Sequence, residues 1–144
     1  MELIGMELVT VLDIEYVSIR HNPEEKFMWN EWRESIPSQQ LREAMMFACD
    51  FILDNEVELI LADYTRMHAT TVEDQVWIAT HSAEKLQHSR LRKVANVMAH
   101  DVFQQIAIEN IYEKASEIPL PCVSEAFFTK EAALDWLFSD KYAF

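Results

Sequence analysis

Chemically versatile side chains gather between residues 63 and 71 of this sequence. Within Asp63 to Thr71 stand a carboxylate, a phenol, hydroxyls, a guanidinium and an imidazole. Such groups form ion pairs, transfer protons or hold a metal when a fold brings them together. The segment is therefore the first candidate for a functional site.

The elements on either side predict where this segment lies. The continuous apolar run 59–62 is typical of a strand buried on both faces. Thr71 and Asp74 fit a capping box and predict that a helix begins after Thr71. We therefore predict a loop over 63–71 at the carboxyl end of a strand, where open α/β sheets bind ligands and partners. The candidate binding residues are those of the loop and of the start of the next helix, namely Asp63, Tyr64, Thr65, Arg66, His68, Thr70, Glu73 and Trp77.

Two interpretations of the acid and the histidine stay open. Asp63 is expected first to accept hydrogen bonds from nearby backbone N–H groups or to pair with Arg66. His100 follows the next predicted strand, so Asp63, His68 and His100 could also meet as a metal or acid–base site. Solvated or capping roles are favoured, and we assign no catalytic residue, no metal ligand and no cofactor. Gly5 is the single glycine, which excludes a glycine-rich phosphate loop.

The rest of the chain predicts the frame around the segment. Strands are expected at 8–12, 17–20, 27–32, 59–62, 93–98 and 122–128, and helices after the caps Ser38, Thr71, Asp101 and Thr129. The order β-β-β-α-β-α-β-α-β-α predicts an α/β domain with a mixed sheet and helices packed on it, spanning 1–144. We expect both faces of the strand 27–32 to be covered, because apolar side chains alternate on each.

Periodicity also predicts which helical positions are buried. On the second helix a stripe that includes Val72 and Val76 is expected inside, and Asp74 outside. On the third helix Val102 and Ile106 are expected inside. Cys49 and Cys122 are expected to be buried thiols.

Composition narrows the class of partner. The formal net charge of −13 argues against nucleic acid and anionic membrane, both of which need a basic face. No apolar run reaches the roughly 18 residues of a membrane span, and the acidic start does not resemble a secretory signal. We expect a cytoplasmic protein without an integral membrane segment. Trp29 and Trp32 of the early strands are expected in the core or, as a hypothesis, at a homodimer contact.

The chain resembles the SpoIIAA-like fold shared by STAS domains and SEC14-type lipid-binding domains. Its element order carries the resemblance, together with Leu61-Ala62-Asp63, Arg66-Met67, Glu73-Asp74 and Trp77. More narrowly, it resembles small bacterial proteins described as STAS/SEC14 domain-containing, most of which have no assigned function. The segment 63–67 is similar in register to the Asp-Leu-Ser-x-Val motif of STAS domains. Val72 and Glu73 occupy the two serine positions of their Asp-Ser-Ser-Gly motif, so no phosphoacceptor is carried over.

The resemblance implies two functions from different classes, and a third comes from the residues alone. The first is a non-enzymatic interaction or signalling module that binds a protein partner through the loop 63–71 and the start of the next helix. The second is a carrier of a small molecule or lipid, which needs an apolar cavity of roughly several hundred Å³. The third is an enzyme or metal site at the strand-end loops.

Overall fold

A six-stranded mixed sheet forms the centre of the computed structural model, which describes residues 2–3 and 5–139. Its strands, in spatial order, are β3 (Val9–Asp13), β4 (Val17–Asn22), β5 (Phe27–Glu34), β6 (Leu59–Met67), β7 (Lys93–Val97) and β8 (Val123–Phe127). The helices are α1 (Ser38–Asp54), α2 (Val72–Leu86), α3 (Val102–Ala115) and α4 (Lys130–Leu137). Strands β3, β4 and β5 pair antiparallel, whereas β5 to β8 pair parallel. The predicted element order and mixed sheet are confirmed.

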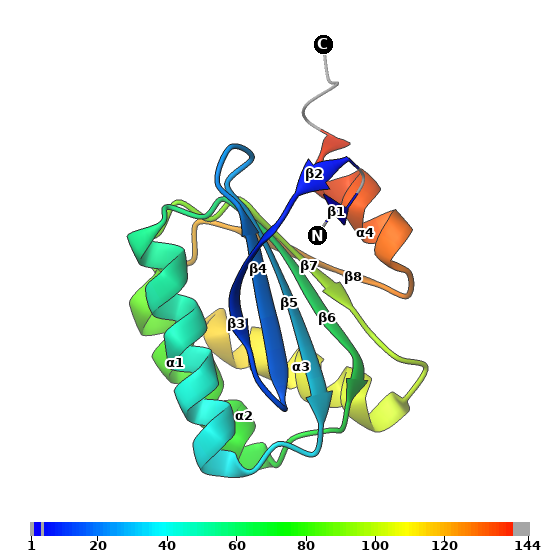
Figure 1. The fold of residues 1–144 in the computed structure, drawn as a ribbon. Coiled ribbons are helices and arrows are strands. Elements are labelled where there is room, and N and C mark those ends of the chain that lie inside the picture. The colour runs from blue at the N-terminus through cyan, green and yellow to red at the C-terminus, as the bar shows by residue number, and fades with distance from the viewer. Residues whose placement is uncertain (1, 4, 140–144) are drawn as a thin grey trace.

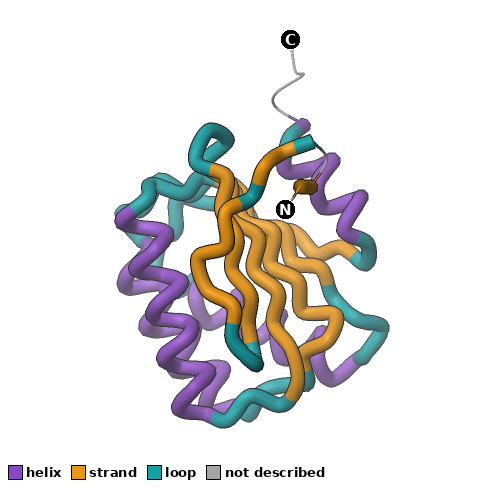
Figure 2. The backbone as a smooth tube through the Cα atoms, in the orientation of Figure 1, coloured by secondary structure: helices purple, strands orange, loops and turns teal. Residues whose placement is uncertain are grey.

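The two faces of the sheet carry different layers (Figure 1). Helices α1, α2 and α3 cover one face side by side, and α4 covers the other. A short hairpin, β1 (Glu2–Leu3) and β2 (Met6–Glu7), lies beside α4 and was not predicted (Figure 2). Gly5 turns this hairpin at φ 80°, a conformation that glycine adopts without steric cost.

Alternation along β5 places large side chains on both faces of the sheet. Met28 and Trp32 pack toward α1 to α3, whereas Phe27 and Trp29 pack toward α4. Both tryptophans are buried, so the hypothesis that they form a homodimer contact is wrong. The strand is covered on both faces, as predicted.

Three of the four predicted helix caps are confirmed. The hydroxyls of Thr71 and Thr129 and the carboxylate of Asp101 accept hydrogen bonds from backbone N–H groups in the first turns of their helices. The prediction for α1 was wrong, because Pro37 is its N-cap and Ser38 is the first helical residue. The Ser38 hydroxyl instead donates to Asp74 Oδ1 at 2.5 Å, which links α1 to α2.

The first turns of α2 and α3 are rotated relative to the prediction. Asp74 is buried while Val72 and Val76 are exposed, and in α3 Gln104 is buried while Val102 and Ile106 are exposed. In α2, Asp74 faces inward because it accepts hydrogen bonds from the Ser38 hydroxyl and the Arg42 guanidinium of α1. In α3, the Gln104 side chain donates to the Tyr64 and Met67 carbonyl oxygens of β6, which lie beyond the residues that pair with β7. Polar side chains thus take inward positions and turn apolar ones outward.

Candidate functional site

The segment predicted as a loop is mostly strand. Strand β6 continues to Met67, so Asp63, Tyr64, Thr65 and Arg66 are strand residues and the connection to α2 is only residues 68–71. The extension follows from β5, which pairs in parallel with β6 as far as Glu34 and Met67 after a register shift near Glu31. The prediction of a loop from 63 was therefore wrong, although these residues do lie at the carboxyl end of a strand, β6.

Asp63 has a local structural role. Its Oδ1 accepts hydrogen bonds from the Thr65 backbone N–H at 2.9 Å and from the Thr65 hydroxyl at 2.7 Å. Arg66 does not pair with Asp63 but points to solvent, with its Nη2 4.0 Å from Glu34 Oε1. Of the two local roles expected for Asp63, the structure selects hydrogen bonding over the ion pair.

The suggested metal or acid–base cluster does not form. His68 Nδ1 lies 2.7 Å from the Ser35 hydroxyl, and the ring of His100 stacks on Phe128 with centroids 4.6 Å apart. In the described part of the chain, no three His, Cys, Asp or Glu side chains lie close enough together to hold a metal ion. The structure thus separates Asp63, His68 and His100.

Glu73 and Trp77 belong to the surface between α1 and α2. The Arg42 guanidinium lies 4.9 Å above the Trp77 ring and 3.9 Å from Glu73 Oε1. The His81 ring stacks on Trp77, with centroids 4.1 Å apart. The contacts of Arg42 with Trp77 and Glu73 link the first half of α2 to α1.

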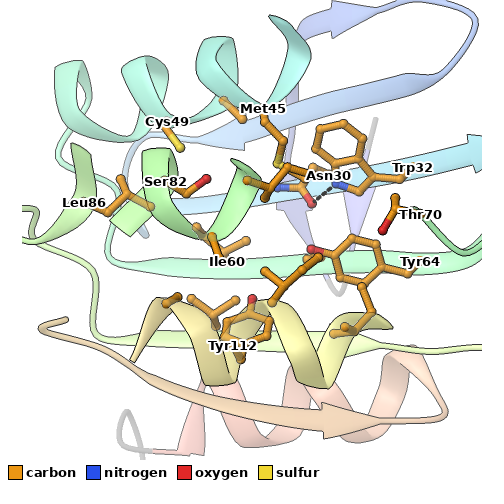
Figure 3. A pocket seen from close by; sticks show the side chains of 18 of the residues that line it. Asn30, Trp32, Met45, Cys49, Ile60, Tyr64, Thr70, Ser82, Leu86 and Tyr112 are labelled. Atoms are coloured by element: carbon orange, nitrogen blue, oxygen red, sulfur yellow. Dashed lines mark hydrogen bonds between the residues drawn. The ribbon is translucent and has the colours of Figure 1, made fainter. Parts of the chain in front are cut away.

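Tyr64, His68 and Thr70 line an internal cavity of about 130 Å³, which the sequence did not reveal. It lies between the sheet and the three-helix layer (Figure 3). Apolar side chains make up most of its lining, among them Trp32, Met45, Ile52, Ile60, Met67, Ile78, Leu86, Leu91, Val94, Ile108 and Ile111. The exposed residues His68 and Ala69 place one side of the cavity close to the surface.

The alanines of four elements leave this space open. The lining includes Ala48 of α1, Ala62 of β6, Ala79 and Ala83 of α2, and Ala107 and Ala115 of α3. An alanine side chain ends at Cβ, so it adds little volume at the positions where it lines the cavity. These alanines are the sequence signal for the cavity. They reveal it only once the strand register and the helix orientations are known.

The described lining of the cavity contains neutral polar groups and one histidine, His68. Among its described lining residues there is no Asp, Glu, Lys or Arg, and the polar groups are neutral ones such as the hydroxyls of Tyr64, Thr70, Ser82 and Tyr112. The Tyr112 hydroxyl donates to Asn96 Oδ1 at 2.9 Å, and Trp32 Nε1 donates to Asn30 Oδ1 at 2.9 Å. These bonds hold two aromatic rings in place at the wall.

Burial disfavours ionisation of two tyrosines and of a cysteine at the wall. Burial raises the pKa of Tyr112 to about 12 and that of the Cys49 thiol to about 11. The pKa of Tyr64 rises well above its usual range, through burial first and then through its neighbour Tyr112. A cavity that disfavours charge on its own side chains disfavours a charged ligand for the same reason.

Comparison with known proteins identifies the fold. No family model and no curated protein matches the chain. Among solved structures, it is similar to an uncharacterized protein of the DUF3478 family with a SpoIIAA-like fold from Shewanella loihica PV-4. The sequences are 14% identical, the TM-score is 0.56, and the match covers 88% of this chain and 97% of the other. The fold is SpoIIAA-like.

The SpoIIAA-like fold confirms the resemblance that the element order implied. It leaves function open, because the same architecture supports many activities. In the described residues no helix is long and apolar enough to cross a membrane. What the chain does must be argued from the cavity and from the exposed residues at the end of β6.

Proposed function

We propose that this protein binds a small, uncharged and mainly apolar molecule inside the cavity. The observation that carries the proposal is an internal space of about 130 Å³ whose described lining has no acidic side chain, lysine or arginine. An apolar cavity of roughly 150 Å³ is known to take up benzene or xenon, so this one suits a molecule of about that size. A lipid chain is larger than this, so the ligand is a small molecule and not a lipid.

Thermal unfolding with matched probes tests this proposal. Benzene and toluene at about tenfold above their dissociation constants should stabilise the fold by about 1.4 kcal/mol and raise Tm by about 4 °C. Benzoate and benzylamine have similar rings but carry charges, and they should leave Tm unchanged, because the cavity offers no partner for a charge. No shift with any neutral probe, or an equal shift with benzoate, would contradict the proposal.

A second candidate is the interaction module, acting through exposed residues at the end of β6 and the starts of α2 and α3. We name this set the strand-end surface; it comprises Arg66, Val72, Val76, Val102, Phe103 and Ile106. Phe103 is 75% exposed, although large aromatic side chains usually avoid such exposure. Apolar side chains that gather at a surface are typical of protein interaction sites.

Affinity capture from the source cell tests the second candidate. The double variant Arg66→Ala, Phe103→Ser should lose a partner that the wild type captures and that rebinds when purified. Phe47→Ser, which removes an exposed phenylalanine from α1, should keep that partner. Equal capture by all three proteins would show that the strand-end surface is not the binding site.

A further inference from the structure

Ser82 of α2 has a hydroxyl that the fold satisfies only weakly. Its Oγ is buried, lines the cavity and makes no hydrogen bond of normal geometry, and beside it lies the Cys49 thiol, a weak hydrogen-bonding group. Buried hydroxyls in native proteins nearly always have a partner, because an unpaired one loses its hydration without compensation. The side chain therefore calls for an explanation in terms of what occupies the cavity.

A helical serine normally has a partner at hand. Its hydroxyl can donate to the carbonyl oxygen four residues earlier, which here belongs to Ile78. His81, one position before, does use this arrangement, because its Nδ1 lies 2.8 Å from the Trp77 carbonyl oxygen. The Ser82 hydroxyl is directed instead toward the interior of the cavity, near Cys49 (Figure 3).

We propose that the ligand of the cavity is a neutral ring compound with one hydrogen-bonding group, and that Ser82 Oγ binds this group. The inference rests on the proposed ligand site and specifies its chemistry. Trp32, Tyr64 and Tyr112 supply aromatic walls, and Met45 and Met67 supply thioethers that pack well against rings. The Ser82 end supplies the polar contact, and the ligand group is neutral because the described lining holds no acidic side chain, lysine or arginine.

At the Ser82 end, the cavity accommodates one hydrogen-bonding group of the ligand. Figure 3 places Ser82 and Cys49 together, apart from Tyr64 and Thr70. The Cys49 thiol is a weak hydrogen-bonding group and its raised pKa keeps it uncharged. A phenol, a small cyclic alcohol or a small cyclic ketone fits this arrangement, whereas a sugar or an amino acid has too many polar groups.

Isothermal titration with phenol and toluene tests the inference, because the two molecules differ by a hydroxyl in place of a methyl group. A purely apolar cavity prefers toluene, since phenol must give up its hydration. The wild type should bind phenol at least as tightly as toluene. Ser82→Ala should bind phenol about tenfold more weakly and toluene within about twofold of wild type.

Thr70→Val is the matched control. Thr70 Oγ1 is also buried without a hydrogen-bond partner and lines the cavity, but at the other end from Ser82. This variant should keep the wild-type ratio of phenol to toluene affinity. Ligand-free Ser82→Ala should have a Tm no lower than wild type, because it removes an unpaired buried hydroxyl, and this shows that the variant folds.

The outcomes separate the inference from the proposed function. If toluene binds and phenol binds far more weakly in wild type, or if the phenol preference survives in Ser82→Ala, the role of Ser82 is wrong and the ligand site stands. If the preference is lost in Thr70→Val and kept in Ser82→Ala, the polar group is bound at the other end. If neither probe binds to wild type, the proposed function fails and the inference fails with it.

Discussion

The two faces of the central sheet are packed differently. Toward α4, Phe27, Trp29, Leu61 and Leu137 form a cluster of buried side chains, and none of them lines the cavity. Toward α1, α2 and α3 the cluster is larger, yet it encloses an open volume and two hydroxyls without partners. The α4 face also holds a buried polar atom without a partner, Trp29 Nε1, so the open volume is what distinguishes the two faces.

The difference originates in the alternation of side chains along the strands. In β6, Ile60, Ala62 and Tyr64 face the cavity, while Leu59 and Leu61 face α4. The α4 face combines large side chains with the fully buried Ala95 and Ala133 against a single short helix. On the other face Ala62 lines the cavity together with alanines of α1, α2 and α3, and the volume between the layers is not filled.

The largest expected effect comes from truncating adjacent residues on opposite faces of β6. Leu61→Ala should lower the free energy of unfolding by about 4 kcal/mol, because it opens a new cavity in a filled layer. Ile60→Ala should cost only about 2 kcal/mol, because Ile60 already borders an open space and has fewer contacts to lose. Urea denaturation measures both values, and an equal or reversed order would remove the distinction between the faces.

A matched pair of enlargements should give the next largest effect. Ala95→Val, in β7 toward α4, should destabilise the fold by about 1–3 kcal/mol through overpacking. Ala62→Val, in β6 toward the cavity, should change stability by less than about 0.5 kcal/mol, because the added methyl groups enter open space. If Ala62→Val costs as much as Ala95→Val, the cavity is not open in solution.

The polar link that holds α2 to α1 should make the helical layer sensitive to acid. Burial alone raises the pKa of Asp74, but hydrogen bonds from Ser38 and Arg42 and the charge of Arg42 outweigh it, so that the pKa is lowered overall. The stability from this carboxylate is fully present above the unfolded pKa of about 3.9 and is lost as the pH falls through the lower folded value.

Asp74→Asn tests this link and should cost about 1–2 kcal/mol at pH 7. Its stability should also fall less than that of wild type when unfolding is measured at pH values from 6 down to 3. Because other carboxylates titrate in the same range, the comparison between the two proteins decides the outcome. Parallel pH profiles would show that Asp74 contributes no acid sensitivity.

The smallest expected effect concerns His21 of β4, which packs edge-on against Phe51 of α1. Burial first, and then the charge of Lys26, lower the pKa of His21. The folded protein therefore resists protonation, and its stability, complete above the unfolded pKa of about 6.5, should decline as the pH falls below that value. His21→Phe should flatten this decline between pH 7.5 and 5.5, whereas an unchanged slope would assign it to other groups.

Local rules predicted most of the fold. Apolar runs and capping residues located every strand of the main sheet and the starts of α2, α3 and α4. The prediction was wrong where one element depends on another, as at the end of β6. No local pattern shows that β5 would extend β6 to Met67, or that Gln104 would turn inward to bind its carbonyl oxygens. Val102 lies outward because Gln104 turns inward, and Val72 lies outward because Asp74 binds Ser38 and Arg42 of α1.

The candidate site was predicted only in part. The sequence directed attention to the end of β6, and Tyr64, His68 and Thr70 do line the cavity. The remaining walls come from α1, α2 and α3, and Ser82 drew no attention, because a serine on a helix is ordinary until its hydroxyl is seen without a partner. A cavity is a property of packing between distant segments, so periodicity within one segment cannot reveal it.

The most direct test of the ligand site is a toluene titration of the ¹⁵N-labelled protein followed by two-dimensional NMR. We expect saturable shifts at lining residues of β6, α1, α2 and α3, such as Ala62 and Ser82, with little change in α4. Ala62→Ile, which fills part of the cavity, should abolish or strongly weaken these shifts. The absence of saturable shifts, or shifts confined to Phe103 and its neighbours on the strand-end surface, would contradict the account.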